Sequence, residues 1–328
     1  MALSSDEIIK REIKDTLGDR HGNLWLRIFP QSSNDDQKLF TDGGLTFSYQ
    51  GVDYGSCDAG WFIRKDGKNI PFIGLEGTDA LNRKSSGNAQ YQRFHHALGA
   101  VKNGLIGVYY LKKGIDKIQE DLFGMALAAT NHEKGTYLII DDLEDIRPII
   151  EHYDDPVVVE QCKNKILKQM EIKFKSKFNT RYKGSWEVFA KKRSTIIKND
   201  VIIKYAGRMR RNFTDSSQRA GHIAVGEMYL TKYYFYGKKI YYLMPKMTRA
   251  DIQYLDIHKA DDKEWYLLRH EPMVEMKSMD DIVGLDADTK KKLLSIQNEP
   301  LKDFALDIWN QCIEKIDRGL RNGTLTVK

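Results

Sequence analysis

The sequence predicts an α/β protein of mixed α+β type, with a central mixed β-sheet flanked by helices. Short apolar runs alternate with segments in which apolar residues recur at helical spacing. An Asp66-Gly67 turn joins two of these runs, as in a β-hairpin. Two further runs, 105–111 and 137–140, are almost entirely apolar, as expected of buried strands.

The elements of the first half follow from local patterns. Ser4 or Ser5 is a suitable N-cap for a helix with an Ile8, Ile9, Ile13 and Leu17 stripe, which Gly18 ends. Period-two alternation and the hairpin turn predict the first strands, and helical spacing predicts the helices. The expected strands are 24–29, 45–49, 58–64, 70–76, 105–111 and 137–140, and the expected helices between them are 88–102 and 115–130.

After about residue 150 the pattern becomes mainly helical, then mixed and basic. A helix is expected over 156–178, strands over 201–205, 227–236 and 239–244, and an amphipathic helix over 300–319. The last two strands suggest a hairpin that turns at 236–238. We therefore expect a first part over 1–150 and a basic part over 151–328 for DNA binding or dimerisation, or a single compact unit.

Composition limits the class of protein. Of the 328 residues, 41% are hydrophobic and 30% are charged, which is typical of a soluble globular protein. No apolar run is long enough to span a bilayer, so no membrane partner is expected. Cys57, Cys162 and Cys312 are few and scattered, which favours a reducing cytoplasm over a disulfide framework or a cysteine zinc site.

Positive charge is concentrated in one segment. The net charge is +6, but residues 161–220 contain seventeen Lys or Arg against four Asp or Glu, with aromatic residues between them. A solvated helix surface would explain a shorter run of charge. An excess of this size favours a polyanion partner, and we expect that partner to be DNA.

Two carboxylates stand at corresponding points of the predicted hairpin. Asp58 opens its first strand and Glu76 closes its second. Pairing across the turn places residues whose numbers sum to about 133 or 134 opposite one another, so Asp58 faces Leu75 or Glu76. Carboxylates on neighbouring strands are suited to hold Mg²⁺ against a phosphodiester. Taken singly, acids at strand ends are more often only solvated.

This segment resembles the PD-(D/E)XK nucleases, which include most type II restriction endonucleases. The resemblance covers roughly 1–141 and lies in the order α-β-β-β-α-β, with Asp58 matching the first motif acid and Glu76 the second. It implies a restriction-endonuclease-like core and a Mg²⁺ site formed by Asp58, Glu76 and the Gly77 carbonyl. Thr78 stands where the family has lysine, so Thr78 would orient the attacking water.

A cation near that water would then come from elsewhere. Lys84 is the preferred candidate, and Lys65 and Lys102 are alternatives. An acid of the first helix, Glu7 or Glu12, is a further possible ligand. His95-His96 suggests a metal site, but the pair has no Cys or acid at ligand spacing and is more typical of a helix surface or core.

Residue types that contact phosphates and base edges occur in two regions. The first precedes and begins the 88–102 helix, where a capped turn is the alternative interpretation, and the second is the basic segment with the loop after it. The candidates are Asn82, Arg83, Ser85, Ser86, Asn88, Gln90, Gln92, Arg93, Arg181, Lys183, Lys191, Lys192, Arg208, Arg210, Arg211, Gln218, Arg219 and His222.

The expected function is therefore that of a type II restriction endonuclease, a Mg²⁺-dependent hydrolase that cuts double-stranded DNA at specific sites. Cutting a palindromic site on both strands favours a homodimer. The resemblance also implies a cognate DNA methyltransferase as genetic partner. Two alternatives remain: a structure-specific or repair nuclease on the same core, and a DNA-binding protein without catalysis.

Overall fold

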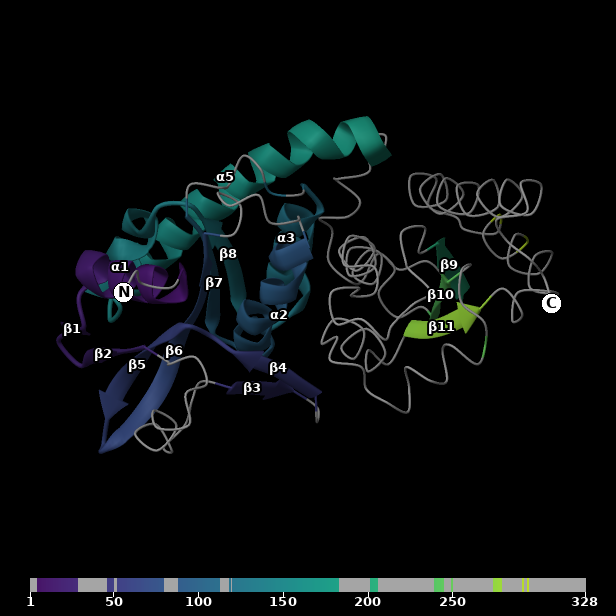
Figure 1. Cartoon of the computed structure of the whole chain (residues 1–328). Coiled ribbons are helices and arrows are strands. Elements are labelled where there is room, and N and C mark those ends of the chain that lie inside the picture. The colour runs from purple at the N-terminus through teal and green to yellow at the C-terminus, as the bar shows by residue number, and fades with distance from the viewer. Residues whose placement is uncertain are drawn as a thin grey trace. The chain divides into compact units, whose positions relative to one another are not determined.

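The computed structural model of the chain divides into two compact units, Met1–Lys175 and Ser176–Lys328 (Figure 1). The first unit extends 25 residues beyond the division expected near residue 150, because helix α5 (Pro156–Tyr182) begins in it. The structure describes residues 5–28, 46–49, 52–79, 88–112, 118, 120–182, 201–205, 239–244, 249, 274–278, 291 and 294.

A six-stranded mixed sheet forms the centre of the first unit, in the order β1-β2-β5-β6-β7-β8. The pairs β1–β2, β2–β5 and β5–β6 are antiparallel, whereas β6–β7 and β7–β8 are parallel. The strands are β1 (Arg20–His21), β2 (Leu24–Ile28), β5 (Ala59–Lys65), β6 (Lys68–Thr78), β7 (Ile106–Leu111) and β8 (Thr136–Ile140).

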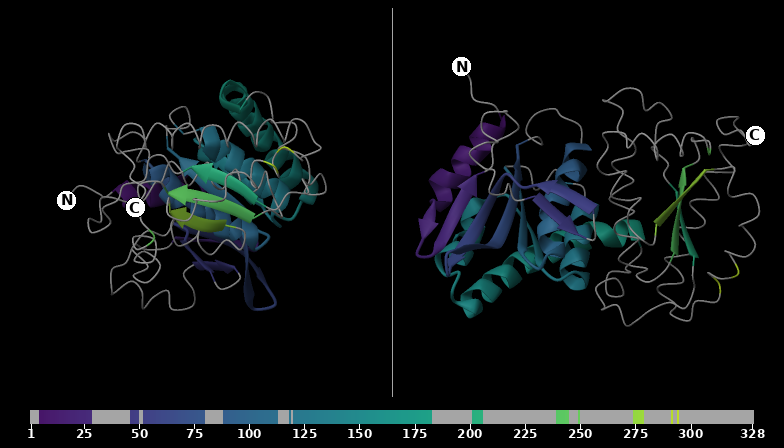
Figure 2. Two further views of the ribbon diagram at one scale, coloured as in Figure 1. Left: turned by 90° about the vertical axis from the view of Figure 1, so that its right-hand side faces the viewer. Right: turned by 90° about the horizontal axis from the view of Figure 1, so that it is seen from below.

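Helices lie on both faces of this sheet (Figure 2). Helix α1 turns a buried stripe of Ile9, Ile13 and Leu17 inward, while α2 carries the parallel crossover from β6 to β7. A two-stranded ribbon packs on α2. The helices of the unit are α1 (Ser5–Leu17), α2 (Asn88–Lys102), α3 (Glu120–His132), η3 (Leu143–Ile146), α4 (Arg147–Glu151) and α5, and the ribbon strands are β3 (Thr46–Tyr49) and β4 (Val52–Ser56).

Two glycines allow the helices to approach the sheet closely. A Cβ on Gly77 would lie 2.5 Å from Cγ2 of Ile9, and one on Gly107 would lie 2.2 Å from the carbonyl oxygen of Ala97. Alternation along the paired strands β6 and β7 puts these positions on opposite faces of the sheet. Helix α1 is therefore in close contact with one face and α2 with the other.

The register of the β5–β6 hairpin follows the expected sums. Lys65 pairs with Lys68, which sums to 133, and Ala59 pairs with Leu75, which sums to 134. The change occurs at a β-bulge between the pairs Trp61–Ile73 and Phe62–Pro71, where Phe72 is the additional residue.

The described part of the second unit contains a parallel three-stranded sheet. Strand β10 (Lys239–Met244) lies between β9 (Val201–Tyr205) and β11 (Val274–Ser278). Residues 227–236 and 300–319, for which a strand and a helix were expected, lie outside the described residues. No helix within the described ranges is long and apolar enough to cross a membrane.

The predicted class, a mixed sheet flanked by helices, is confirmed for the first unit. Helix 88–102 and strands 201–205 and 239–244 have the expected bounds. Strands β1, β4 and β11 were not expected from the sequence.

Candidate active site

The two carboxylates of the hairpin lie side by side and are largely buried. Asp58 lies between β4 and β5, and the pairing of Ala59 with Leu75 carries Asp58 opposite Glu76. The Gly77 N–H donates a hydrogen bond of 2.9 Å to Oδ2 of Asp58. Only 2% of Glu76 and 8% of Asp58 is exposed, so both acids are largely removed from bulk water.

A guanidinium from α2 contacts three oxygens of this site. Nη1 of Arg93 lies 3.0 Å from Oε1 of Glu76, 3.0 Å from the Gly77 carbonyl oxygen and 3.9 Å from Oδ2 of Asp58. The oxygens of Asp58, Glu76 and Gly77 thus converge on one cationic nitrogen, and we call these three groups the carboxylate site.

Two further basic side chains contact the acids. Nζ of Lys10, from α1, lies 3.9 Å from Oδ1 of Asp58, and its side chain is only 11% exposed. Nδ1 of His96 lies 2.9 Å from Oε2 of Glu76 and forms an ion pair when the ring is protonated. The close approach of α1 at Gly77 places Lys10 beside Asp58.

The negative charge of the acids affects their neighbours. Burial raises the pKa of the Cys57 thiol, and the charges of Glu76 and Asp58 raise it further. Burial also raises the pKa of Tyr109, which pairs with Glu76 across β6 and β7, and the Glu76 charge adds to this. Both groups stay protonated near neutral pH, so neither adds negative charge to the site.

Of the expected site residues, the structure brings together Asp58, Glu76, Gly77 and Thr78. Thr78 ends β6, is 4% exposed, and shares a sheet face with Glu76 by alternation. Lys84 lies outside the described residues. Lys102 contacts Glu133 at 3.2 Å instead.

The expected DNA contacts are mostly undescribed. Arg93 is the exception, and its side chain bonds the carboxylate site. The positions outside the described residues are Asn82, Arg83, Ser85, Ser86, Lys183, Lys191, Lys192, Arg208, Arg210, Arg211, Gln218, Arg219 and His222, and only the backbone is described at Asn88, Gln90, Gln92 and Arg181.

Sequence reasoning missed Lys10 and His96. A signal for Lys10 exists, because it directly follows Ile9 of the apolar stripe and therefore borders the face that packs on the sheet. The His95-His96 pair stands out in the sequence, but the acid that His96 contacts is Glu76, twenty residues away on a strand. Local ligand spacing cannot show such a pair. Glu12, a possible extra ligand, is instead 2.7 Å from Nζ of Lys112.

The site fits a hard divalent cation in the character of its donors. It offers two carboxylates and one carbonyl, the oxygen ligands that Mg²⁺ takes while keeping several waters. The position of Nη1 of Arg93 marks where these oxygens meet. Among the described residues no three His, Cys, Asp or Glu side chains group as metal ligands, so such an ion would rely on the carbonyl and on water.

Comparisons with known proteins leave the family open. No protein-family model, no curated protein and no solved structure matches the chain.

Proposed function

We propose that the chain is a Mg²⁺-dependent DNA endonuclease of the type II restriction class, related to the PD-(D/E)XK nucleases. The observation that carries the proposal is the convergence of Asp58, Glu76 and the Gly77 carbonyl on one cationic nitrogen. Sites of this kind neutralise the charge that develops when a phosphodiester is cut.

The order of elements supports the same proposal. The first unit contains α1, β2, β5, β6, α2 and β7 in that order, with β1 inserted between α1 and β2 and with β3 and β4 inserted between β2 and β5. Asp58 directly precedes the second strand of this series and Glu76 lies in the third, close to the arrangement that the resemblance implies.

The chain's own residues have distinct roles in this proposal. Bound Mg²⁺ would supply positive charge to the phosphate and to the attacking water. Asp58, Glu76 and the Gly77 carbonyl would hold the ion, and the Thr78 hydroxyl would orient the water. Lys10 already stands beside Asp58 and takes the place of the missing motif lysine, with Lys84 as the alternative suggested by the sequence.

The proposed partners are double-stranded DNA and a second copy of the chain. A palindromic site cut on both strands calls for two active sites related by a two-fold axis. A cognate methyltransferase would protect the host DNA, and we propose it as the genetic partner.

The test is a digest of unmethylated phage DNA with Mg²⁺, using wild type and Glu76→Gln. Glutamine keeps the shape of Glu76 but removes its charge, so we expect cleavage to fall at least about 100-fold. Gel-shift affinity in EDTA should stay close to wild type, because binding depends mainly on phosphate contacts. Glu144→Gln is the matched control, since it removes an exposed carboxylate paired with Arg147 on another element.

The outcomes separate the alternatives. Discrete bands from wild type and from Glu144→Gln would support restriction, and a smear would favour a repair nuclease. Equal cleavage by Glu76→Gln would refute the assignment. Binding without cleavage in any divalent ion would leave a DNA-binding protein. One observation favours that second candidate: Arg93 and Lys10 already compensate the two acids, as in a purely structural ion-pair network.

A further inference from the structure

Three arginines stack on two aromatic rings at the β1 edge of the central sheet. The guanidinium carbon of Arg20 lies 4.4 Å from the centre of the Trp25 ring, and that of Arg64 lies 5.9 Å from the same ring. The guanidinium carbon of Arg27 lies 5.3 Å from the Phe62 ring. We call these five residues the arginine face.

Strand pairing puts all five residues on one side of the sheet. Trp25 pairs with Arg20 on β1 and with Phe62 on β5. Arg27 and Arg64 each lie two positions from one member of this row, and residues two apart in a strand point to the same side. The stacked pairs are therefore one surface and not three separate contacts.

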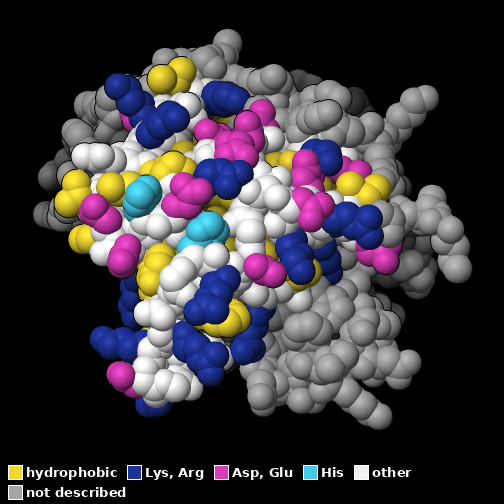
Figure 3. Space-filling model, turned by 90° about the vertical axis from the view of Figure 1, so that its left-hand side faces the viewer, with side chains coloured by type: hydrophobic (Ala, Val, Ile, Leu, Met, Phe, Trp, Pro, Cys, Tyr) yellow, Lys and Arg dark blue, Asp and Glu magenta, His cyan; other side chains and the backbone are white. Residues whose placement is uncertain are grey.

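The charges of this surface are available to a partner. Arg20 and Arg64 are exposed and Arg27 is half-buried, and none of the three forms an ion pair with a carboxylate of the described residues. Stacking holds each guanidinium by its flat face and leaves N–H groups at its edge, although Nε of Arg20 bonds the Gly22 carbonyl. Figure 3 shows Lys and Arg side chains gathered around hydrophobic ones in its lower part, on the side of the molecule that carries the β5–β6 hairpin.

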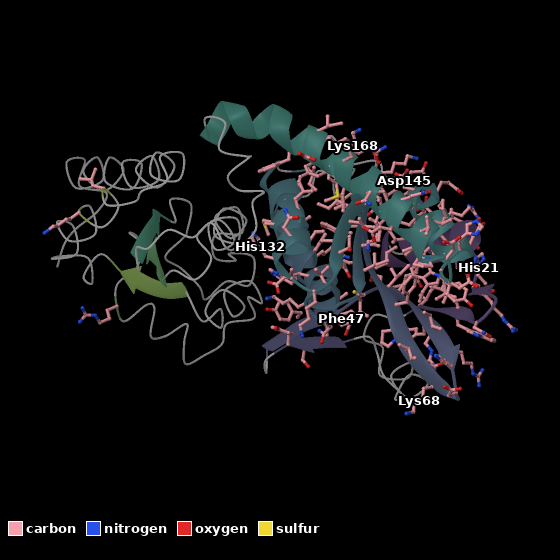
Figure 4. The ribbon with its side chains drawn as sticks, turned by 180° about the vertical axis from the view of Figure 1, so that it is seen from behind. His21, Phe47, Lys68, His132, Asp145 and Lys168 are labelled. Carbon is pink, nitrogen blue, oxygen red and sulfur yellow. The ribbon has the colours of Figure 1, made fainter. Side chains whose placement is uncertain are left out.

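The arginine face shares its side of the sheet with Glu76. Arg27 pairs with Gly60, Gly60 pairs with Gly74, and Glu76 lies two residues beyond Gly74. Strand spacings place the Cα atoms of Arg27 and Glu76 about 12 Å apart. Phe47 packs over Gly74 between them, so the arginines and the acids are two neighbouring contact points on one side. Figure 4 shows Phe47 of β3 and, at the far tip of the hairpin, Lys68.

We propose that the arginine face binds backbone phosphates of the double-stranded DNA whose phosphodiester lies at the carboxylate site. This inference rests on the proposed function and adds a path for the substrate. Arg64 lies six residues along β5 from Asp58, about 20 Å. At about 3.4 Å per base-pair step, the arginines would meet phosphates roughly four to six steps from the scissile one. Charge favours a polyanion, and the ordered guanidinium edges favour phosphate oxygens.

The test compares two triple variants of the full chain with equal net charge. Arg20→Gln/Arg27→Gln/Arg64→Gln removes the charges of the arginine face. The control, Arg11→Gln/Lys14→Gln/Lys134→Gln, removes three exposed charges elsewhere in the first unit. Binding of a fluorescent DNA duplex is measured in EDTA over a series of salt concentrations.

We expect the arginine-face variant to bind the duplex at least tenfold more weakly. The magnitude of the slope of log affinity against log salt concentration should fall by about 2 to 3, since each phosphate contact contributes about 0.9 to that slope. The control should keep nearly the wild-type slope. As a check that does not depend on the variant's fold, bound DNA should slow phenylglyoxal modification of Arg20, Arg27 and Arg64 in wild type, but not that of Arg11.

Several results would overturn the inference. Equal losses in both triple variants would show that only net charge matters. An unchanged arginine-face variant, or arginines that DNA does not protect, would mean that the guanidiniums only cover Trp25 and Phe62. Wild type that binds anionic lipid vesicles and not DNA would assign the surface to a membrane. If wild type cleaves DNA while the variant binds normally, this inference alone fails; if wild type neither binds nor cleaves DNA, the proposed function fails as well.

Discussion

Replacing Arg93 by methionine removes the guanidinium that contacts all three groups of the carboxylate site. Inner-sphere Mg²⁺ would lie about 2.1 Å from the same oxygens, so Nη1 of Arg93 and the ion cannot occupy the site together. Binding of the ion must therefore break the hydrogen bonds that Arg93 donates. A variant without them should bind the ion more tightly.

The size of the effect follows from the hydrogen bonds that the substitution removes. A hydrogen bond to a charged group is worth about 1.5–3 kcal/mol, and the Arg93 side chain is 31% exposed, so about 2 kcal/mol is a reasonable total after solvent screening. By linkage, the free energy of unfolding of the metal-free variant falls by this amount, and its free energy of metal binding becomes more favourable by the same amount. We expect a Tm lower by about 4–8 °C in EDTA. We also expect about 30-fold tighter binding of Mg²⁺ or Mn²⁺.

Calorimetric titration with Mn²⁺ and thermal melts in EDTA measure both quantities. Arg147→Met is the control, because Arg147 bonds Glu144 and the Thr16 carbonyl, outside the carboxylate site. It should lower Tm without changing metal affinity. Equal or weaker metal binding by Arg93→Met would refute the reasoning. If wild type and the variant both bind no divalent ion, the carboxylate site is not a metal site.

Other predictions concern the free energy of unfolding, measured with urea. Gly107→Ala should lower it by at least about 3 kcal/mol, because the added Cβ would lie 2.2 Å from a backbone oxygen of α2. Gly67→Ala, in open space at a φ of 73°, should lower it by only about 1 kcal/mol, and similar losses in the two variants would argue against tight packing of α2. Glu133→Gln removes the carboxylate that contacts the Lys102 ammonium, whose side chain is only 5% exposed. The same measurement should show a loss of about 3 kcal/mol in the free energy of unfolding. A loss near zero would show that water compensates the charge of Lys102. Burial raises the pKa of Tyr137, so the unfolded chain loses the phenol proton at a lower pH than the folded chain does. The stability present below pH about 10 should therefore fall as the pH rises above that value. The urea midpoint of Tyr137→Phe should fall less over the same pH range, and an equal fall would contradict this cause.

The sequence was sufficient to predict most of the first unit because local signals agree there. The Asp66-Gly67 turn fixes the hairpin register, and Asp66 and Gly67 both adopt the positive φ that such a turn requires. Strand β4 was missed because its sequence, VDYGS, is short and carries no strong strand pattern.

The surroundings of the acids could not be predicted in the same way. Asp58 and Glu76 belong to one hairpin, so the position of its turn sets the strand pairing and brings the two acids together. Lys10 comes from α1 and Arg93 from α2, and their positions depend on how closely these two helices pack against the sheet. Arg93 has the residue type of a DNA contact, and only the packing of α2 shows that it contacts the acids.

The bulge at Phe72 gives β6 one residue more than regular pairing with β5 requires, which is why the sum of paired residue numbers rises from 133 to 134. Deleting this residue would restore a sum of 133 along the whole strand, so Glu76, moved back by one position, would still lie opposite Asp58. Inserting one residue between the bulge and Glu76 would instead turn Glu76 toward α1, away from Arg93 and His96. Related chains should therefore lose a residue at the bulge more readily than they gain one between the bulge and Glu76.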